Sequence, residues 1–155
     1  MNIRIAEVRD IPALLALLVQ VAEVHRALRP DLFSAGTQKY SETQLAAMLN
    51  DPQKPIFVAE TDGKVVGHLF CALRDYGTEG VFLPYRSLYI EDFCIDEAYR
   101  GTGVGTQLYQ YARDFAKRSG CYNLTLNVWT ANRGAVDFYA ACGMSAQRLV
   151  MEQIL

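Results

Sequence analysis

A short glycine-rich segment restricts the possible folds of this chain more than any other feature. Residues 99–105 read YRGTGVG, with three glycines in seven positions. They follow a β-rich run and precede a segment with the periodicity of an amphipathic helix. A strand, a glycine loop and a helix in this order point the unpaired amides of the first helical turn outward, at the positive end of the helix dipole. This order predicts an anion site suited to a pyrophosphate; a glycine-rich turn without a ligand is the alternative.

The spacing of these glycines argues against two common nucleotide sites. A Walker P-loop needs a lysine after its last glycine, and none is present. A dinucleotide-binding fingerprint needs GxGxxG near the first strand, whereas here the glycines are spaced two residues apart and position 106 is threonine. The amides of residues 102–106 and the charge of Arg100 remain as the predicted anion ligands.

Composition excludes several partners and predicts the cellular location. The net charge of -2 and pI near 5.7 argue against nucleic acid, which needs a basic face. The four cysteines form no CxxC or Cys/His pair, so we expect no metal site and a reducing, cytoplasmic location. The longest apolar run, residues 11–24, contains Pro12, Gln20 and Glu23 and is expected to be too short to span a membrane. A length of 155 residues fits a single domain, 1–155.

Hydrophobic periodicity predicts an α/β chain with a mixed sheet and helices on both faces. Asp10 is the expected N-cap of the first helix, and Ser41 with Gln44 resembles a capping box for the second. The predicted strands are residues 2–8, 56–60, 65–74, 87–95, 122–129 and 147–154, and the predicted helices are residues 11–28, 41–49, 103–118 and 132–142.

Two motifs together resemble the GNAT N-acetyltransferases. RGTGVG (residues 100–105) matches their R/Q-x-x-G-x-G/A acetyl-CoA motif, and YIEDFCIDEAYRG (residues 89–101) resembles their fourth strand. LNVWTANRGAVDFYAACGM (residues 126–144) resembles their second signature, and the order of the elements agrees over nearly the whole chain. The resemblance implies a GNAT fold, a mostly antiparallel mixed sheet flanked by helices on both faces.

The same resemblance implies which residues hold acetyl-CoA. Main-chain groups of Phe93, Cys94 and Ile95 would pair with the pantetheine arm as an added strand would. Asn132 is expected to be a further coenzyme contact. The alternative is that its side chain caps a helix. The pyrophosphate would lie on Arg100 and on the amides of Gly101, Thr102, Gly103, Val104, Gly105 and Thr106.

Candidate catalytic groups follow from the chemistry of acetyl transfer to an amine. The leaving thiolate, with a thiol pKa of about 8.5, needs a proton, which the phenol of Tyr139 could supply as general acid. An alkylamine with a pKa of about 10.4 must lose a proton, so Glu91 and Asp92 are candidate bases or amine-binding carboxylates. Successive strand residues face opposite sides unless a bulge intervenes, so we expect one of them to serve the substrate. IED (residues 90–92) resembles the corresponding stretch of spermidine/spermine acetyltransferases, in which the Glu lines the amine site, and this resemblance favours Glu91.

The sequence therefore predicts an acetyl-CoA-dependent N-acetyltransferase that acts by direct attack of an amine in a ternary complex. A small-molecule amine is the favoured acceptor. The alternatives are a protein N-terminal α-amine acetyltransferase and a non-catalytic acyl-CoA-binding module. Only twelve residues follow Gly143, where the family commonly has two strands, and a homodimer is possible at that edge.

Overall fold

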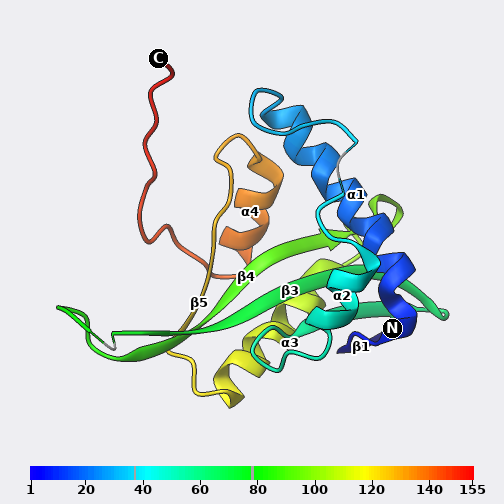
Figure 1. Cartoon of the computed structure of the whole chain (residues 1–155), viewed down its shortest axis with the longest axis horizontal. Helices are drawn as coiled ribbons and strands as arrows, with labels where there is room; N and C mark the ends of the chain where they lie inside the picture. The colour runs from blue at the N-terminus through cyan, green and yellow to red at the C-terminus, as the bar shows by residue number, and fades with distance from the viewer. Residues whose placement is uncertain (37, 78) are drawn as a thin grey trace.

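A five-stranded sheet lies at the centre of the computed structural model, which describes residues 1–36, 38–77 and 79–155 (Figure 1). The strands stand in the order of the chain, β1-β2-β3-β4-β5. Neighbours pair antiparallel except β4 and β5, which are parallel, so the predicted mixed, mostly antiparallel sheet is confirmed. The strands are β1 (Asn2–Ile5), β2 (Ile56–Thr61), β3 (Lys64–Tyr76), β4 (Tyr85–Ile95) and β5 (Asn123–Leu126).

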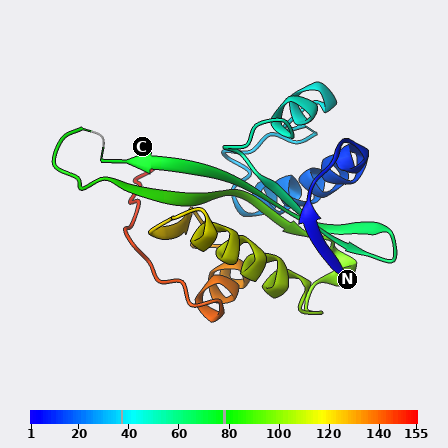
Figure 2. The same ribbon diagram turned by 90° about the horizontal axis from the view of Figure 1, so that it is seen from below.

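Helices cover both faces of the sheet, as predicted. Helices α1 (Ile11–Leu28) and α2 (Glu42–Met48) lie on one face, and α3 (Val104–Arg118) and α4 (Arg133–Ala141) lie on the other (Figure 2). Short 3-10 turns precede α1 (Val8–Asp10) and follow β4 (Glu97–Tyr99). The sheet is therefore buried from two sides, and each face has its own hydrophobic core.

The two cores fix the orientation of the strands. The core under α3 includes Phe57, Leu88 and Leu108, each fully buried. The core under α1 and α2 includes Leu14 and Phe70. Burying one such side chain contributes about 1.5–3 kcal/mol to the stability of the fold. A strand that turned over would remove its side chains from both cores and lose these contributions.

The first helix extends beyond the apolar run of residues 11–24. Residues 8–28 are, by length and composition alone, long enough to cross a membrane, and an 18-residue window within them has a mean hydropathy of 1.5. The expectation of an insufficient length was therefore wrong. Core helices of soluble proteins share this property, and Leu14, Leu17 and Leu18 of α1 are buried against the sheet and α2.

The caps of the first two helices follow different rules. Ser41 accepts a hydrogen bond from the amide of Gln44, whose side chain accepts one from the Ser41 amide, so the predicted capping box is confirmed. Asp10 stands at the N-cap of α1 but makes no side-chain cap bond. Its carboxylate instead accepts hydrogen bonds from Arg4 and from the amide of Glu7. The Asp10 carboxylate thus pairs with Arg4 instead of capping α1.

The predicted final strand, residues 147–154, is absent: residues 144–155 form no helix or strand in the part of the chain that the structure describes. This segment runs apart from the sheet (Figure 1); Glu152 pairs with Arg29 at the end of α1, and Leu149, Val150 and Ile154 are 74%, 91% and 74% exposed. Residues that favour a strand form one only where another strand supplies hydrogen bonds, and among the described residues no strand lies beside them.

Candidate functional site

An extra residue in β4 separates two halves of that strand. Phe70 of β3 pairs with Asp92 and Cys71 pairs with Ile90, so Glu91 is the bulged residue without a partner in β3. Without a bulge, Ile90 and Phe93 would face opposite sides of the sheet. Both instead pack into the core under α3.

Beyond the bulge, β4 has a neighbour on one side only. Pairing with β5 runs from Ser87 to Ile90, whereas pairing with β3 continues to Ile95. We call residues Glu91–Ile95 the open edge of β4. Its main-chain groups can accept an extended ligand as a further strand. The three residues predicted for the pantetheine arm lie on this edge, with Cys94 in one core and Phe93 and Ile95 against the other.

The glycine loop lies directly after the open edge. Gly101 and Gly103 have φ of 76° and 88°, the left-handed region that disfavours other residues. The first hydrogen bond of α3 runs from the amide of Gln107 to the carbonyl of Gly103 (3.2 Å), so the amides of Val104, Gly105 and Thr106 have no intrahelical partner. This geometry fits an anion at the helix N-terminus.

Polar side chains of the loop have internal partners. Thr102 Oγ1 donates to the carbonyl of Tyr99 (2.7 Å), which leaves its amide as the group that could bind an anion. Arg100 Nε donates to the carbonyl of Ile95 (3.1 Å), which holds its guanidinium between the open edge and the loop. Asn132 Oδ1 caps α4 by accepting from the amide of Ala135 (3.2 Å), so the capping role of Asn132 is confirmed and a coenzyme contact through its amide nitrogen stays a prediction.

Tyr139 reaches the other side of the open edge from α4. Its ring centroid lies 6.2 Å from that of Phe93 and 5.3 Å from that of Phe138. Burial, together with the charge of Asp92, raises the pKa of Tyr139 above that of an ordinary phenol. The side chain therefore keeps its proton at neutral pH and can donate it.

Asp92 is the most enclosed carboxylate of the site. His68 Nε2 lies 3.1 Å from Oδ1 of Asp92, and Lys39 Nζ donates to Oδ2 at 2.6 Å. Burial alone would raise the pKa of Asp92, but the interactions with His68 and Lys39 lower it below its usual value. Asp92 is thus ionised at neutral pH and needs a cation beside it.

Glu91 has a different partner on the same side of the sheet. Its Oε1 lies 3.6 Å from Nη2 of Arg74, whose guanidinium stacks over the ring of Tyr89 at 3.6 Å. Burial alone would lower the pKa of Lys39, but Asp92, Tyr40 and Glu91 raise it above its usual value. Both carboxylates therefore act on one ammonium. The bulge interrupts the alternation, so the argument that only one of them can face the substrate does not apply, and the choice of Glu91 stays a prediction.

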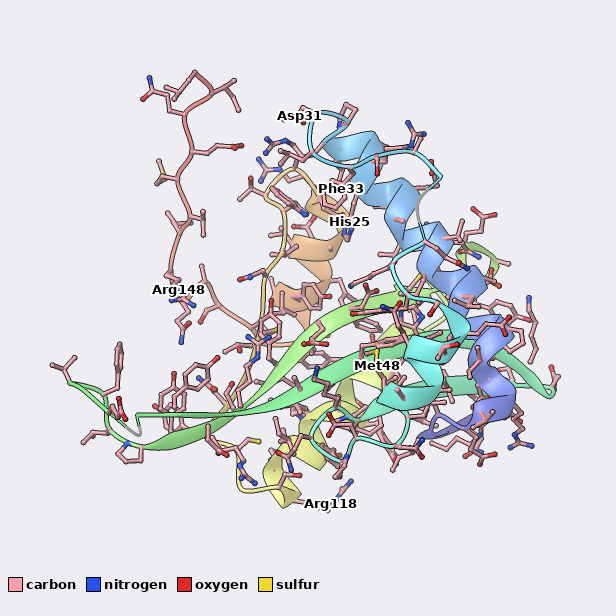
Figure 3. All side chains as sticks on the ribbon, in the orientation of Figure 1. His25, Asp31, Phe33, Met48, Arg118 and Arg148 are labelled. Atoms are coloured by element: carbon pink, nitrogen blue, oxygen red, sulfur yellow. The ribbon has the colours of Figure 1, made fainter. Side chains whose placement is uncertain are left out.

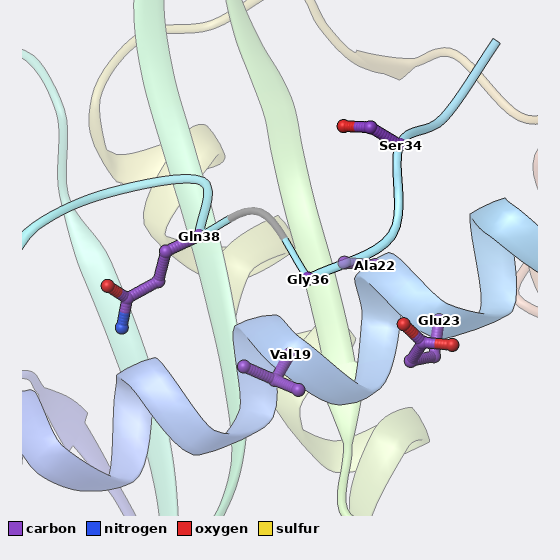
Figure 4. Close-up of a pocket in the computed structure, with 6 residues that line it drawn as sticks. All are labelled: Val19, Ala22, Glu23, Ser34, Gly36 and Gln38. Carbon is purple, nitrogen blue, oxygen red and sulfur yellow. The ribbon is translucent and has the colours of Figure 1, made fainter.

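A cavity of about 250 Å³ adjoins Asp92 and Lys39. It lies between α1, the segment that follows α1, and β4. His25 and Phe33 form part of its wall, with ring centroids 5.3 Å apart (Figure 3). A larger hollow of about 350 Å³ opens between α1 and the residues Ser34, Gly36 and Gln38, and its lining contains none of the predicted site residues (Figure 4). The smaller cavity is lined by Leu18, Val21, Ala22, His25, Phe33, Lys39 and Asp92.

The chemistry of the described residues favours direct transfer over an acyl-enzyme. Burial and the neighbouring Asp92 raise the pKa of the Cys94 thiol to about 12, despite Arg100, so the thiolate that attacks a thioester is scarce. In the ranges 1–36, 38–77 and 79–155, no group of three His, Cys, Asp or Glu side chains is arranged to hold a metal ion.

Sequence reasoning missed two residues that the structure places at the site. His68 is fully buried and faces Asp92. Lys39 comes from the segment between α1 and α2, where no periodicity indicates a position. The place of His68 follows only from the observed register of β3 and β4, which pairs it with Cys94 and so sets it diagonally opposite Asp92.

Comparison with known proteins gives a family match over most of the chain. The model of the "Acetyltransferase (GNAT) family" matches residues 21–144. An uncharacterized N-acetyltransferase of Methanocaldococcus jannaschii is 27% identical over 113 residues, which are 73% of this chain and 49% of that protein. The chain thus spans about half the length of this relative.

Two further proteins are similar over more of their length. The thialysine N-epsilon-acetyltransferase of Bos taurus is 29% identical over 136 residues, which are 88% of this chain and 73% of that protein. A crystal structure of a Bacillus halodurans protein superposes with a TM-score of 0.95 at 26% identity, covering 100% of this chain and 99% of that one. The fold seen here is therefore shared with a solved structure from end to end.

Proposed function

We propose that this chain, which belongs to the GNAT acetyltransferase family and is an acyltransferase, moves an acetyl group from acetyl-CoA to a primary amine of a small molecule. The observation that carries the proposal is the open edge of β4, which leads into the glycine loop and has two carboxylates beside it. An extended thioester arm on that edge, with its pyrophosphate on the amides of residues 101–106, would bring its acyl end toward Glu91.

Each residue of the site has a defined task in this proposal. Asp92 binds the incoming ammonium, and Glu91 helps to remove its proton. The amine then attacks the thioester directly, and Tyr139, protonated because its pKa is raised, supplies a proton to the leaving sulfur. Cys94 takes no covalent part, because its thiol keeps its proton.

The size and charge of the cavity support a small cationic acceptor. Its volume of about 250 Å³ suits a short alkylamine, and its one buried carboxylate, Asp92, is matched to a positive charge. The similarity to a thialysine acetyltransferase agrees with an acceptor of this kind. A protein N-terminus would need an open groove instead.

The proposal is tested by measuring free thiol released from acetyl-CoA in the presence of an amine panel. The panel contains short diamines and lysine analogues, amino sugars, and peptides with a free N-terminus. We expect release with the short cationic amines and acetylated product of matching mass. Release with the peptides alone would favour the α-amine acetyltransferase. If no amine stimulates release while coenzyme A still raises the melting temperature, the chain is an acyl-CoA-binding module.

We also propose that the protein forms a homodimer through residues 144–155. These residues include the consecutive apolar side chains of Leu149, Val150 and Met151, which are 74%, 91% and 84% exposed. The outer edge of β5 has no neighbouring strand, so it can pair with this segment of a second copy. Light scattering should give twice the monomer mass, and replacing Val150 and Met151 with lysine should return the monomer. A monomeric native protein would contradict this assembly.

A further inference from the structure

The buried carboxylate of Asp92 already has an ammonium on it. The Asp92 side chain is 4% exposed, whereas that of Lys39, which donates to Oδ2 over 2.6 Å, is 41% exposed. The lysine thus reaches an internal carboxylate from the surface. Since a buried, ionised carboxylate without a cation is costly, this ion pair holds the site together when nothing else is bound.

The position of this ammonium coincides with the expected position of an acceptor. It lies in the wall of the 250 Å³ cavity, against Asp92 and within the electrostatic range of Glu91. Asp92 in turn acts on the phenol of Tyr139 from its own side of the open edge. The lysine nitrogen therefore lies on the carboxylate that the proposed transfer would use to bind the amine, within the electrostatic range of the second one.

The contacts of Lys39 allow its side chain to leave. The following residue, Tyr40, is anchored by stacking on Phe70, with centroids 6.0 Å apart and planes at 16°, and Ser41 begins α2. These contacts hold the backbone, whereas the lysine side chain has four rotatable bonds and one strong partner. The ammonium can exchange with a competing cation without unfolding the segment.

We propose that Lys39 is an internal substitute for the acceptor: its ammonium occupies the amine position on Asp92 until a cationic substrate displaces it. This inference rests on the proposed function and narrows the acceptor to alkylammonium compounds that compete with a lysine for one carboxylate. Neutral and anionic amines such as those of acylated sugars or acidic peptides do not displace Lys39. The affinity for acceptors is lowered by the cost of displacing it.

The test removes the internal ammonium and offers a free one. Lys39→Ala deletes the atoms from Cγ to Nζ, which correspond to n-propylammonium. The variant should melt lower than the parent, and millimolar n-propylammonium should raise its melting temperature by about 3 °C. The parent and Lys64→Ala, which removes the exposed partner of Asp96, both keep Lys39 on Asp92 and should respond far less than Lys39→Ala, because the cation must first displace that lysine. The neutral n-propanol should have no effect on any of the three.

Two further measurements keep the outcomes distinct. If Lys39→Ala does not fold alone, Lys39→Gln retains a donor for Asp92, and its KM for cationic amines should fall at least about threefold while kcat changes little. Equal stabilisation of Lys39→Ala and Lys64→Ala by n-propylammonium, or none, would overturn the inference. Rescue by n-propylammonium without any acetyl transfer would support a cation site on Asp92 and reject the proposed reaction instead.

Discussion

Replacing Tyr139 with phenylalanine is expected to lower kcat about 100-fold while leaving the affinity for coenzyme A unchanged. The substitution removes only the hydroxyl, so the ring keeps its contacts with Phe93 and Phe138 and the open edge keeps its shape. Because the pKa of Tyr139 is raised, the phenol is protonated throughout the neutral range, and the loss of turnover should not vary with pH there. Thiol release at saturating amine measures kcat.

Tyr111 provides the matched control, since it is a tyrosine of α3 that packs edge-on to Phe57 with centroids 5.2 Å apart. Tyr111→Phe should change turnover less than twofold. A loss of coenzyme binding in Tyr139→Phe, measured by calorimetry, would mean that the hydroxyl binds the coenzyme. Unchanged turnover would mean that the leaving sulfur takes its proton from another group.

The second large effect is expected at Gly103, where valine should weaken coenzyme A binding about 100-fold. Gly103 has φ of 88°, and a side chain there costs about 1–2 kcal/mol of strain. No atom lies within 4 Å of the position of an added Cβ, so the protein itself has room for one. That room is the space in front of the α3 amides, and the valine side chain would block the phosphates from their hydrogen bonds.

Gly105→Ala separates this effect from a general intolerance of side chains in the loop. The added Cβ would meet Phe138 at 3.4 Å and Ile95 at 3.5 Å, which are ordinary contacts, and the amide stays in place. The alanine variant should bind coenzyme A as the parent does and melt at the same or a slightly higher temperature. Tight coenzyme binding by a folded Gly103→Val protein would exclude the loop as the pyrophosphate site.

Local patterns were sufficient to predict most helices, the glycine loop and the layers of the fold. The capping box at Ser41 and the amphipathic helix after Gly103 each depend on residues close in sequence. The bulge at Glu91 does not depend on residues close in sequence. Both faces of β4 are covered by apolar cores, so the sequence of β4 shows no change of alternation at the bulge. Its existence follows only from pairing with β3, a strand joined to it by a long hairpin.

The partners of the carboxylates were unpredictable for a related reason. Lys39 precedes α2 by three residues, but its contact with Asp92 spans 53 positions of the chain. Residues 147–154, which were predicted to be a strand, show the opposite limit of sequence-based prediction. The residue types in this segment favour a strand, but a strand also needs a neighbouring strand, and no pattern within the segment indicates whether one is present.

The bulge makes this site depend on the number of residues as well as on their kind. Cys71 pairs with Ile90 and Phe70 with Asp92, so deleting Glu91 would leave a regular ladder in which Phe93 and Cys94 keep their faces. Deleting one residue elsewhere in β4 while the bulge remains would instead turn the residues after it to the opposite faces. Loss of a single codon would therefore spare both cores at Glu91 and damage them at its neighbours in the strand.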